Sequence, residues 1–207
     1  MTTRGYPHPY LGEYTSLTPE EAARYCAGSE HQRVREEIAR RVGARTVLDY
    51  GCGPGIDAPR YAPDRYVGVD ASAANVNEAR RRHPEHRFRE LILPLRDALA
   101  GEGPFLNARG YERPDCVMIK SVLEHTPDAA TATALLRDAM RLAREVVFVA
   151  WHTPPRRGAD EVRELDGHFG RAIWQNSYAL EHFAFATPRY VDRVDVFELW
   201  EIPGDGT

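Results

Sequence analysis

The sequence of 207 residues lacks the features that mark several classes of protein. It contains no uninterrupted apolar run of about 18 residues, the length expected of a membrane-spanning helix. No apolar stretch follows a basic start at the N-terminus, as a secretory signal would require. We therefore expect a soluble, cytoplasmic protein without a membrane partner.

Cysteine and lysine are also scarce. The three cysteines, Cys26, Cys52 and Cys116, are odd in number and lack metal-type spacing, so we expect free buried thiols. Lys120 is the only lysine, and the remaining positive charge comes from arginine. The formal net charge of −4 argues against nucleic acid as a partner of the whole chain, and leaves a local basic patch open.

The most informative segment that is present reads TVLDYGCGPG and begins at Thr46. An apolar strand end is followed by an acid and then by Gly51, Gly53 and Gly55. Glycine is needed where the backbone takes positive φ, which costs other residues about 1–2 kcal/mol, or where a ligand lies against the main chain. The segment therefore predicts a strand that ends under a nucleotide-like cofactor. The glycines alone fit NAD as well as other nucleotides.

Asp49 distinguishes between NAD and a positively charged ligand, whereas Asp70 suits the ribose of either. Asp49, at the mouth of the loop, would repel a pyrophosphate but suits a ligand that carries an ammonium and a sulfonium. Asp70 ends a second apolar segment, Tyr66–Asp70. An acid in this position can accept hydrogen bonds from both ribose hydroxyls.

Three segments resemble class I S-adenosylmethionine-dependent methyltransferases: VLDYGCGPG from Val47, YVGVDAS from Tyr66 and DCVMIKSVLEHTPD from Asp115. They are similar to the glycine motif, the ribose acid and the fourth-strand motif of that family, and the resemblance covers roughly residues 40–152. It implies S-adenosyl-L-methionine as the cofactor and S-adenosyl-L-homocysteine as the product.

The pattern of apolar residues predicts strands and helices that alternate after Gly43. Such alternation indicates an α/β fold, Rossmann-like and doubly wound, with a mostly parallel sheet and helices on both faces. The resemblance adds an antiparallel C-terminal strand within 189–202. We expect one domain over 1–207, in which 1–42 form an arm and helices that cover the active site. The predicted strands are 46–50, 66–70, about 86–91, 116–120 and 145–151, and the predicted helices are about 30–42, from 57, 73–83, near 94–100, 129–142 and 174–185.

Ligands of open parallel sheets bind beyond the carboxyl ends of the strands. Glu90 and Leu91 follow the third strand, where the resembled family contacts adenine. His152 follows the fifth strand and His168 lies in a turn-like segment beyond it; either imidazole could take a proton from an acceptor, or be a surface histidine. Lys120 is a third catalytic candidate, with a salt-bridged side chain as the alternative. The predicted cofactor-binding residues are Asp49, Gly51, Cys52, Gly53, Asp70, Ala71, Glu90, Leu91 and Ser121.

The resemblance implies methyl transfer, and we expect an oxygen or nitrogen of a small-molecule substrate as acceptor. Relatives that methylate adenine or glutamine carry an Asn/Asp-Pro-Pro-aromatic motif after the fourth strand, where this chain has Lys120-Ser121-Val122-Leu123. Acidic ligands of the metal-dependent catechol type are missing as well, so we expect no metal. Two alternatives stay open: a macromolecular acceptor (RNA or protein), and a cofactor-binding member of the fold that transfers no methyl group. We expect a monomer or homodimer.

Overall fold

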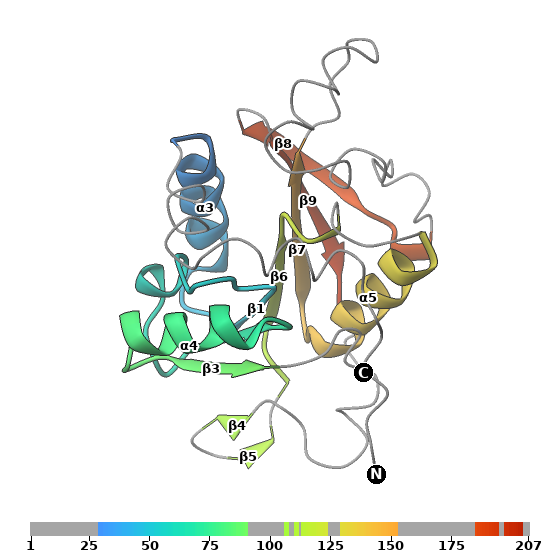
Figure 1. Ribbon diagram of the computed structural model, residues 1–207. Helices are drawn as coiled ribbons and strands as arrows, with labels where there is room; N and C mark the ends of the chain where they lie inside the picture. The colour runs from blue at the N-terminus through green and yellow to red at the C-terminus, as the bar shows by residue number, and fades with distance from the viewer. Residues whose placement is uncertain are drawn as a thin grey trace.

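The computed structural model describes residues 29–90, 106–107, 110–111, 113–123, 129–152, 185–194 and 197–204. Its centre is a seven-stranded sheet of order β3-β2-β1-β6-β7-β9-β8 (Figure 1). The pairs from β3 to β7 are parallel, whereas β9 runs antiparallel to both β7 and β8. This arrangement confirms the predicted fold class. The strands are β1 Val47–Tyr50, β2 Tyr66–Asp70, β3 Arg87–Glu90, β6 Cys116–Lys120, β7 Val146–His152, β8 Arg189–Val194 and β9 Phe197–Pro203.

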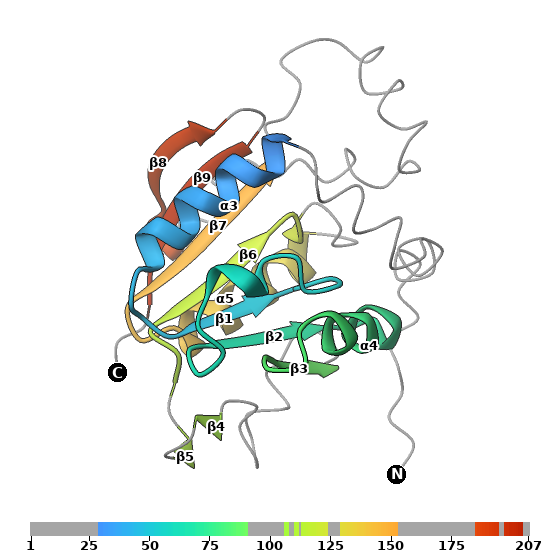
Figure 2. The same ribbon diagram turned by 90° about the vertical axis from the view of Figure 1, so that its left-hand side faces the viewer.

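Helices cover both faces of the sheet. Figures 1 and 2 show α3 (Ser29–Val42) and α4 (Ala73–Arg82) on one face and α5 (Ala129–Leu142) on the other. Successive side chains of a strand point to opposite faces, so each strand contributes to two cores. Leu48 packs in the cluster that holds α5, and Val47 in the cluster that holds α3 and α4.

The helix boundaries follow local chemistry. The backbone N–H of Asn75 donates to Oγ of Ser72 at 3.3 Å, so the Ser72 side chain caps the start of α4. Gly43 follows α3 with φ of +59°, a conformation that glycine adopts without steric cost. The helix predicted over about 30–42 thus ends at the residue expected.

Two local features differ from the sequence analysis. The helix expected from about Asp57 is a single 3-10 turn, Ala58–Arg60. Pro63 explains its shortness, because proline has no N–H to donate to the carbonyl four residues earlier. A small antiparallel sheet of β4 (Leu106–Asn107) and β5 (Gly110–Tyr111) was not predicted. The helices expected near 94–100 and at 174–185 lie outside the described residues, apart from Phe185. Residues 1–28 of the predicted arm and helices over 1–42 also lie outside them.

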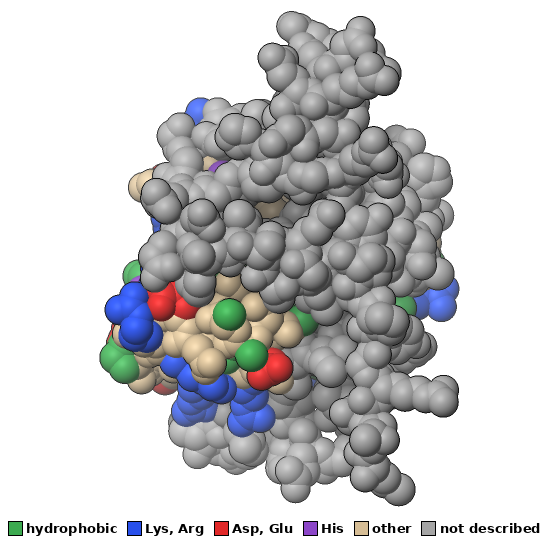
Figure 3. All heavy atoms as spheres, in the orientation of Figure 1, with side chains coloured by type: hydrophobic (Ala, Val, Ile, Leu, Met, Phe, Trp, Pro, Cys, Tyr) green, Lys and Arg blue, Asp and Glu red, His purple; other side chains and the backbone are tan. Residues whose placement is uncertain are grey.

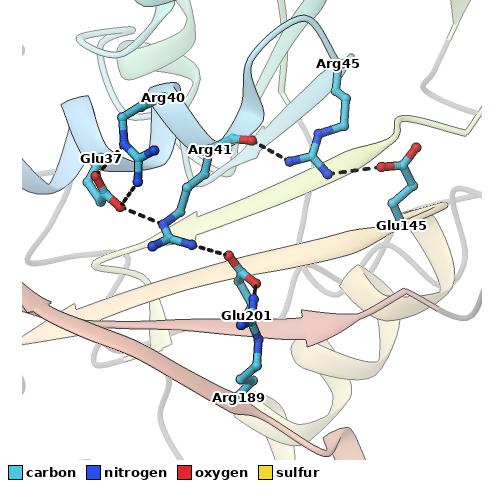
Figure 4. Close-up of polar contacts among 7 residues, drawn as sticks. All are labelled: Glu37, Arg40, Arg41, Arg45, Glu145, Arg189 and Glu201. Atoms are coloured by element: carbon cyan, nitrogen blue, oxygen red, sulfur yellow. Dashed lines mark hydrogen bonds and ion pairs between the residues drawn. The ribbon is translucent and has the colours of Figure 1, made fainter.

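Ion pairs fix α3 on the C-terminal strands (Figure 4). Nη1 of Arg41 lies 2.8 Å from Oε1 of Glu201 in β9, and its Nε pairs with Glu37 one helical turn earlier. Glu201 also pairs with Arg189 of β8. Partly exposed pairs contribute at most about 1 kcal/mol each, so they select the position of α3 rather than supply its stability.

Positively charged side chains gather over α4 and β3 (Figure 3). Arg80, Arg81 and Arg82 close α4, where cations offset the negative end of the helix dipole. Glu78 pairs with Arg81 and Arg82, and the guanidinium of Arg80 donates to the carbonyl of Phe88. These charges are thus engaged by α4 itself and by the neighbouring β3. Among the helices in the described part of the chain, none has the length and apolar composition needed to cross a membrane.

Candidate cofactor site

The glycine loop leaves β1 and turns back over β2. Gly51, Gly53 and Gly55 have φ of +85°, +54° and +76°, so the backbone uses the freedom that the sequence analysis invoked. The backbone N–H groups of Gly51 and Cys52 both donate to the carbonyl of Val69, at 2.8 and 2.9 Å. A Cβ on Gly51 would lie 2.4 Å from Cγ2 of Val122. Both the positive φ and the lack of room for a Cβ therefore favour glycine at position 51.

The described residues leave the loop uncovered at Gly53. Apart from its two chain neighbours, none of them has an atom within 4 Å of the position that a Cβ on Gly53 would occupy. The open space and bare main chain form a cradle of the kind that a nucleotide-like ligand requires.

Asp70 joins the end of β2 to this loop. Its Oδ2 accepts the backbone N–H of Gly53 at 2.8 Å, and its Oδ1 accepts the backbone N–H of Ser72 at 2.8 Å. Burial raises the pKa of Asp70, and these hydrogen bonds oppose the rise. Nδ2 of Asn75 also donates to Oδ1, at 3.4 Å. An ionised carboxylate has about four acceptor positions, so about one remains for a ligand hydroxyl. Glu90 is the register partner of Asp70 on β3, and is exposed.

Asp49 lies deeper than predicted. The sequence analysis placed it at the mouth of the loop, whereas the structure encloses it in β1 with 2% of its surface exposed. The hydroxyl of Tyr66 donates to its Oδ2 at 2.7 Å. Burial, and next the charge of Asp57, raise the pKa of Asp49 to about 7. A direct contact between Asp49 and a ligand stays a prediction.

Lys120 is held in a buried ion-pair network. Its Nζ lies 3.9 Å from Oδ2 of Asp57, and Oδ1 of Asp57 lies 2.9 Å from Nε of Arg35 in α3. The three residues expose 9%, 5% and 2% of their surface respectively. This geometry supports the salt-bridged alternative for Lys120 that the sequence analysis named.

Sequence reasoning missed Asp57 and Arg35. A signal for Arg35 was present, because it shares the apolar stripe of α3 with Ile38 and Val42. A cation on that stripe needs a buried partner. Nothing in the sequence pointed to Asp57 as that partner.

Ser121 directly follows β6 and has a strained conformation. Its φ is +53°, a left-handed value that a non-glycine residue rarely adopts. Its Oγ is buried and has no hydrogen-bond partner within the described residues. Strain of this kind persists where the surroundings enforce it, often at ligand sites. The observation fits the prediction that Ser121 contacts a ligand.

Cys52 packs into the core. Its Sγ would lie 2.9 Å from a Cβ on Gly68, and burial raises the pKa of its thiol well above the ordinary value. Its backbone N–H donates to the carbonyl of Val69, and its carbonyl accepts the backbone N–H of Gly55. The side chain shapes the floor of the loop, and contact with a cofactor stays a prediction.

The carboxyl ends of neighbouring parallel strands bring several predicted residues to one edge. This edge holds the loop after β1, Asp70 at the end of β2 with Ala71 after it, Glu90 at the end of β3, and Ser121 after β6. His152 ends β7, but its side chain lies outside the described part of the structure. Leu91 and His168 also lie outside it.

A doubly wound sheet with a glycine loop, and an acid after the second strand, defines a class of nucleotide-type cofactor folds. Residues 20–194 match the family described as "Methyltransferase domain", and the chain belongs to this family. The resemblance to class I S-adenosylmethionine-dependent methyltransferases is thereby confirmed.

Similar proteins include the trans-aconitate 2-methyltransferase of Delftia acidovorans, which is 34% identical over 103 residues, or 46% of this chain. The match spans about a third (35%) of that relative's length. Two solved structures share the fold. Magnesium protoporphyrin IX methyltransferase (ChlM) of Synechocystis, with bound S-adenosylhomocysteine, has a TM-score of 0.63 at 19% identity, over 94% of this chain and 98% of that one. The N-methyltransferase NodS of Bradyrhizobium japonicum, also with S-adenosylhomocysteine, has a TM-score of 0.65 at 14% identity, over 96% and 99%.

Proposed function

We propose that this protein is an S-adenosyl-L-methionine-dependent methyltransferase that acts on an oxygen or nitrogen of a small molecule. The observation that carries the cofactor assignment is the open backbone above Gly53 beside the Asp70 carboxylate. Similar folds hold S-adenosylhomocysteine in their crystals, which supports the same ligand here. S-adenosyl-L-methionine supplies a methyl group already activated by a sulfonium, which the acceptor takes by in-line displacement.

The residues of this chain mainly position the reactants. Asp70, with Gly53 held against it, is proposed to bind the ribose hydroxyls, and Glu90 and Leu91 to lie beside the adenine. Asp49, Gly51, Cys52, Ala71 and Ser121 complete the proposed cofactor site. Positioning can supply ~7–11 kcal/mol, whereas a general base that accelerates 10²–10⁴-fold supplies roughly 3–5.5 kcal/mol. Alignment therefore outweighs proton removal in this account.

Proton transfer is assigned to a histidine at the carboxyl end of β7 or beyond it. His152, which ends β7, is proposed to take up the proton that the methyl-accepting group loses, with His168 as the alternative. Lys120 is the weaker candidate of the three, because its ammonium already faces Asp57. An ammonium that stays paired and charged cannot take up a further proton.

The small-molecule acceptor is supported by the names of similar proteins, which cite trans-aconitate and magnesium protoporphyrin IX. We further propose a cytoplasmic monomer or homodimer in which residues 1–42 cover the active site. The pairing of Arg35 in α3 with Asp57 behind the glycine loop supports that placement.

The test is release of S-adenosylhomocysteine by the purified chain. The proposal expects release with fractionated small metabolites, and none with RNA or protein fractions of the same cells. Release that depends on RNA or protein, and is abolished by nuclease or protease, would establish the macromolecular alternative. Cofactor binding without turnover on any fraction would establish the non-methylating alternative.

A further inference from the structure

The turn between α4 and β3 gathers three metal-ligand side chains. His83, Glu85 and His86 each offer one ligand atom, and these atoms lie within 4.8 Å of one another. The turn precedes β3, so it lies at the opposite end of that strand from Glu90. The cluster is thus separate from the proposed cofactor site.

The hydrogen bonds of His86 leave one of its nitrogens facing a carboxylate. Nε2 lies 3.0 Å from the backbone carbonyl oxygen of Tyr61, and Nδ1 lies 3.0 Å from Oε1 of Glu85. A carbonyl oxygen only accepts, so Nε2 must carry the proton and donate it. In a neutral ring the lone pair of Nδ1 then faces a carboxylate oxygen. A divalent cation placed between them would bond to both.

This arrangement matches that of a metal-binding histidine. Such a ring donates its other N–H to a backbone carbonyl or carboxylate, which fixes its tautomer and its orientation. His86 is 8% exposed, and the ring of Tyr66 packs edge-on against it at 5.6 Å. Its Nδ1 is therefore held in place before any ligand arrives.

A second histidine lies beside this pair. The rings of His83 and His86 lie 5.8 Å apart at 81° to each other. Two imidazoles and a carboxylate form a donor set typical of divalent transition metals such as Zn²⁺.

We propose that His83, Glu85 and His86 bind one divalent transition-metal ion, with water as the fourth ligand. Tetrahedral ligands with bonds of about 2.0–2.2 Å lie roughly 3.3–3.6 Å apart, so ligand atoms within 4.8 Å of one another must close by about an ångström. Oε1 of Glu85 and Nδ1 of His86 are already 3.0 Å apart, so the closure is between His83 and this pair. The sequence analysis expected no metal on the basis of missing acids after the fourth and fifth strands, and this site lies elsewhere.

The metal site would stabilise the conformation of the glycine loop at Gly55. A Cβ on Gly55 would lie 3.2 Å from Cδ2 of His83, so the loop and the His83 ring are in close proximity. A metal that fixes the His83 ring would restrict the glycine loop at Gly55. The role is structural, and no reaction step passes through the ion.

The test is Zn²⁺ binding by the full-length chain after removal of metal with EDTA. Competition against a chromophoric chelator at pH 7.5 should show one tight Zn²⁺ per wild-type chain. His83→Gln and Glu85→Gln should each weaken that binding at least about tenfold. Arg87→Ala, an exposed change beside the turn, should leave it unaltered.

A thermal scan gives a readout independent of methyl transfer. Zn²⁺ should raise the melting temperature of the wild type and of Arg87→Ala, but not of the double variant His83→Gln/Glu85→Gln, since a ligand stabilises only the state that binds it. Circular dichroism of the double variant checks that it folds. Zn²⁺ binding absent from the wild type, or equally tight in the folded double variant, would overturn the proposal. Either result leaves the cofactor assignment untouched.

Discussion

The carboxylate of Asp70 accepts the backbone N–H of Gly53 at 2.8 Å, and so joins the end of β2 to the middle of the glycine loop. The side chain proposed to bind ribose therefore also fixes the backbone on which the cofactor would lie. Loss of this acid should disturb two contacts rather than one.

Replacing Asp70 with alanine should weaken S-adenosylhomocysteine binding by about 1.5–3 kcal/mol, the range of hydrogen bonds to a charged group. Isothermal titration calorimetry measures the change. Asp64→Ala, an exposed acid in the turn before β2, is the matched control and should bind like the wild type. Equal affinity in the Asp70 variant would remove this carboxylate from the site.

The glycines of the loop should differ in their tolerance of a methyl group. Gly53→Ala has room for a Cβ in the free protein and should cost only the backbone term, about 1–2 kcal/mol. Gly51→Ala adds a clash with Val122, and should cost about 2–5 kcal/mol in total. Urea denaturation of both variants without ligand gives the comparison. Equal losses would show that space at Gly51 is not limiting.

Asp57→Asn should destabilise the fold by about 3–5 kcal/mol, since it leaves Arg35 and Lys120 as buried cations without their carboxylate. Glu145→Gln is the control, because its pair with Arg45 is more exposed and is worth at most about 1 kcal/mol. Free energies of unfolding from urea curves separate the two cases. A loss at Asp57 no larger than at Glu145 would contradict the network.

The wild type should lose stability relative to Asp49→Asn as the pH rises from about 4 to 7. Burial raises the pKa of Asp49 from 3.8 to about 7 in the folded state, so the folded protein holds a proton that the unfolded chain has released. The contribution of the Asp49 proton to the free energy of unfolding is complete below the unfolded-state pKa of 3.8 and is lost above pH 7. Unfolding curves of both proteins across this range supply the difference. A difference that does not change with pH would mean that Asp49 titrates normally.

For His152→Ala we expect lost turnover with unchanged cofactor affinity, since a general base contributes to proton transfer and not to binding of S-adenosylhomocysteine. Steady-state rates and calorimetry on the same preparation separate the two quantities. A variant with full turnover would shift the assignment to His168, or to a reaction without a protein base.

The sequence predicted the features that depend on local pattern. Short apolar runs, separated by predicted helices, located β1, β2, β6 and β7 to within a residue or two. The reason is that a parallel strand buried on both faces is a nearly continuous apolar run. The glycines of the loop were predictable for a similar reason, since their positive φ values reflect a backbone need visible in the residue type itself.

Long-range pairing was not predictable in the same way. The position of Asp49 beneath the loop depends on Tyr66, which lies 17 residues away and faces the same side of the sheet. The ion pair between Lys120 and Asp57 also involves α3, because Asp57 pairs with Arg35, which lies 85 residues before Lys120. Such contacts arise from the way elements stack, which residue spacing alone does not encode.

The identity of the cofactor is best tested by calorimetric titration of the purified chain with S-adenosylmethionine, S-adenosylhomocysteine and NAD. We expect one S-adenosylhomocysteine bound per chain, binding of S-adenosylmethionine at the same site, and no heat of binding with NAD. Saturable binding of NAD, with no binding of either adenosyl compound, would contradict this expectation.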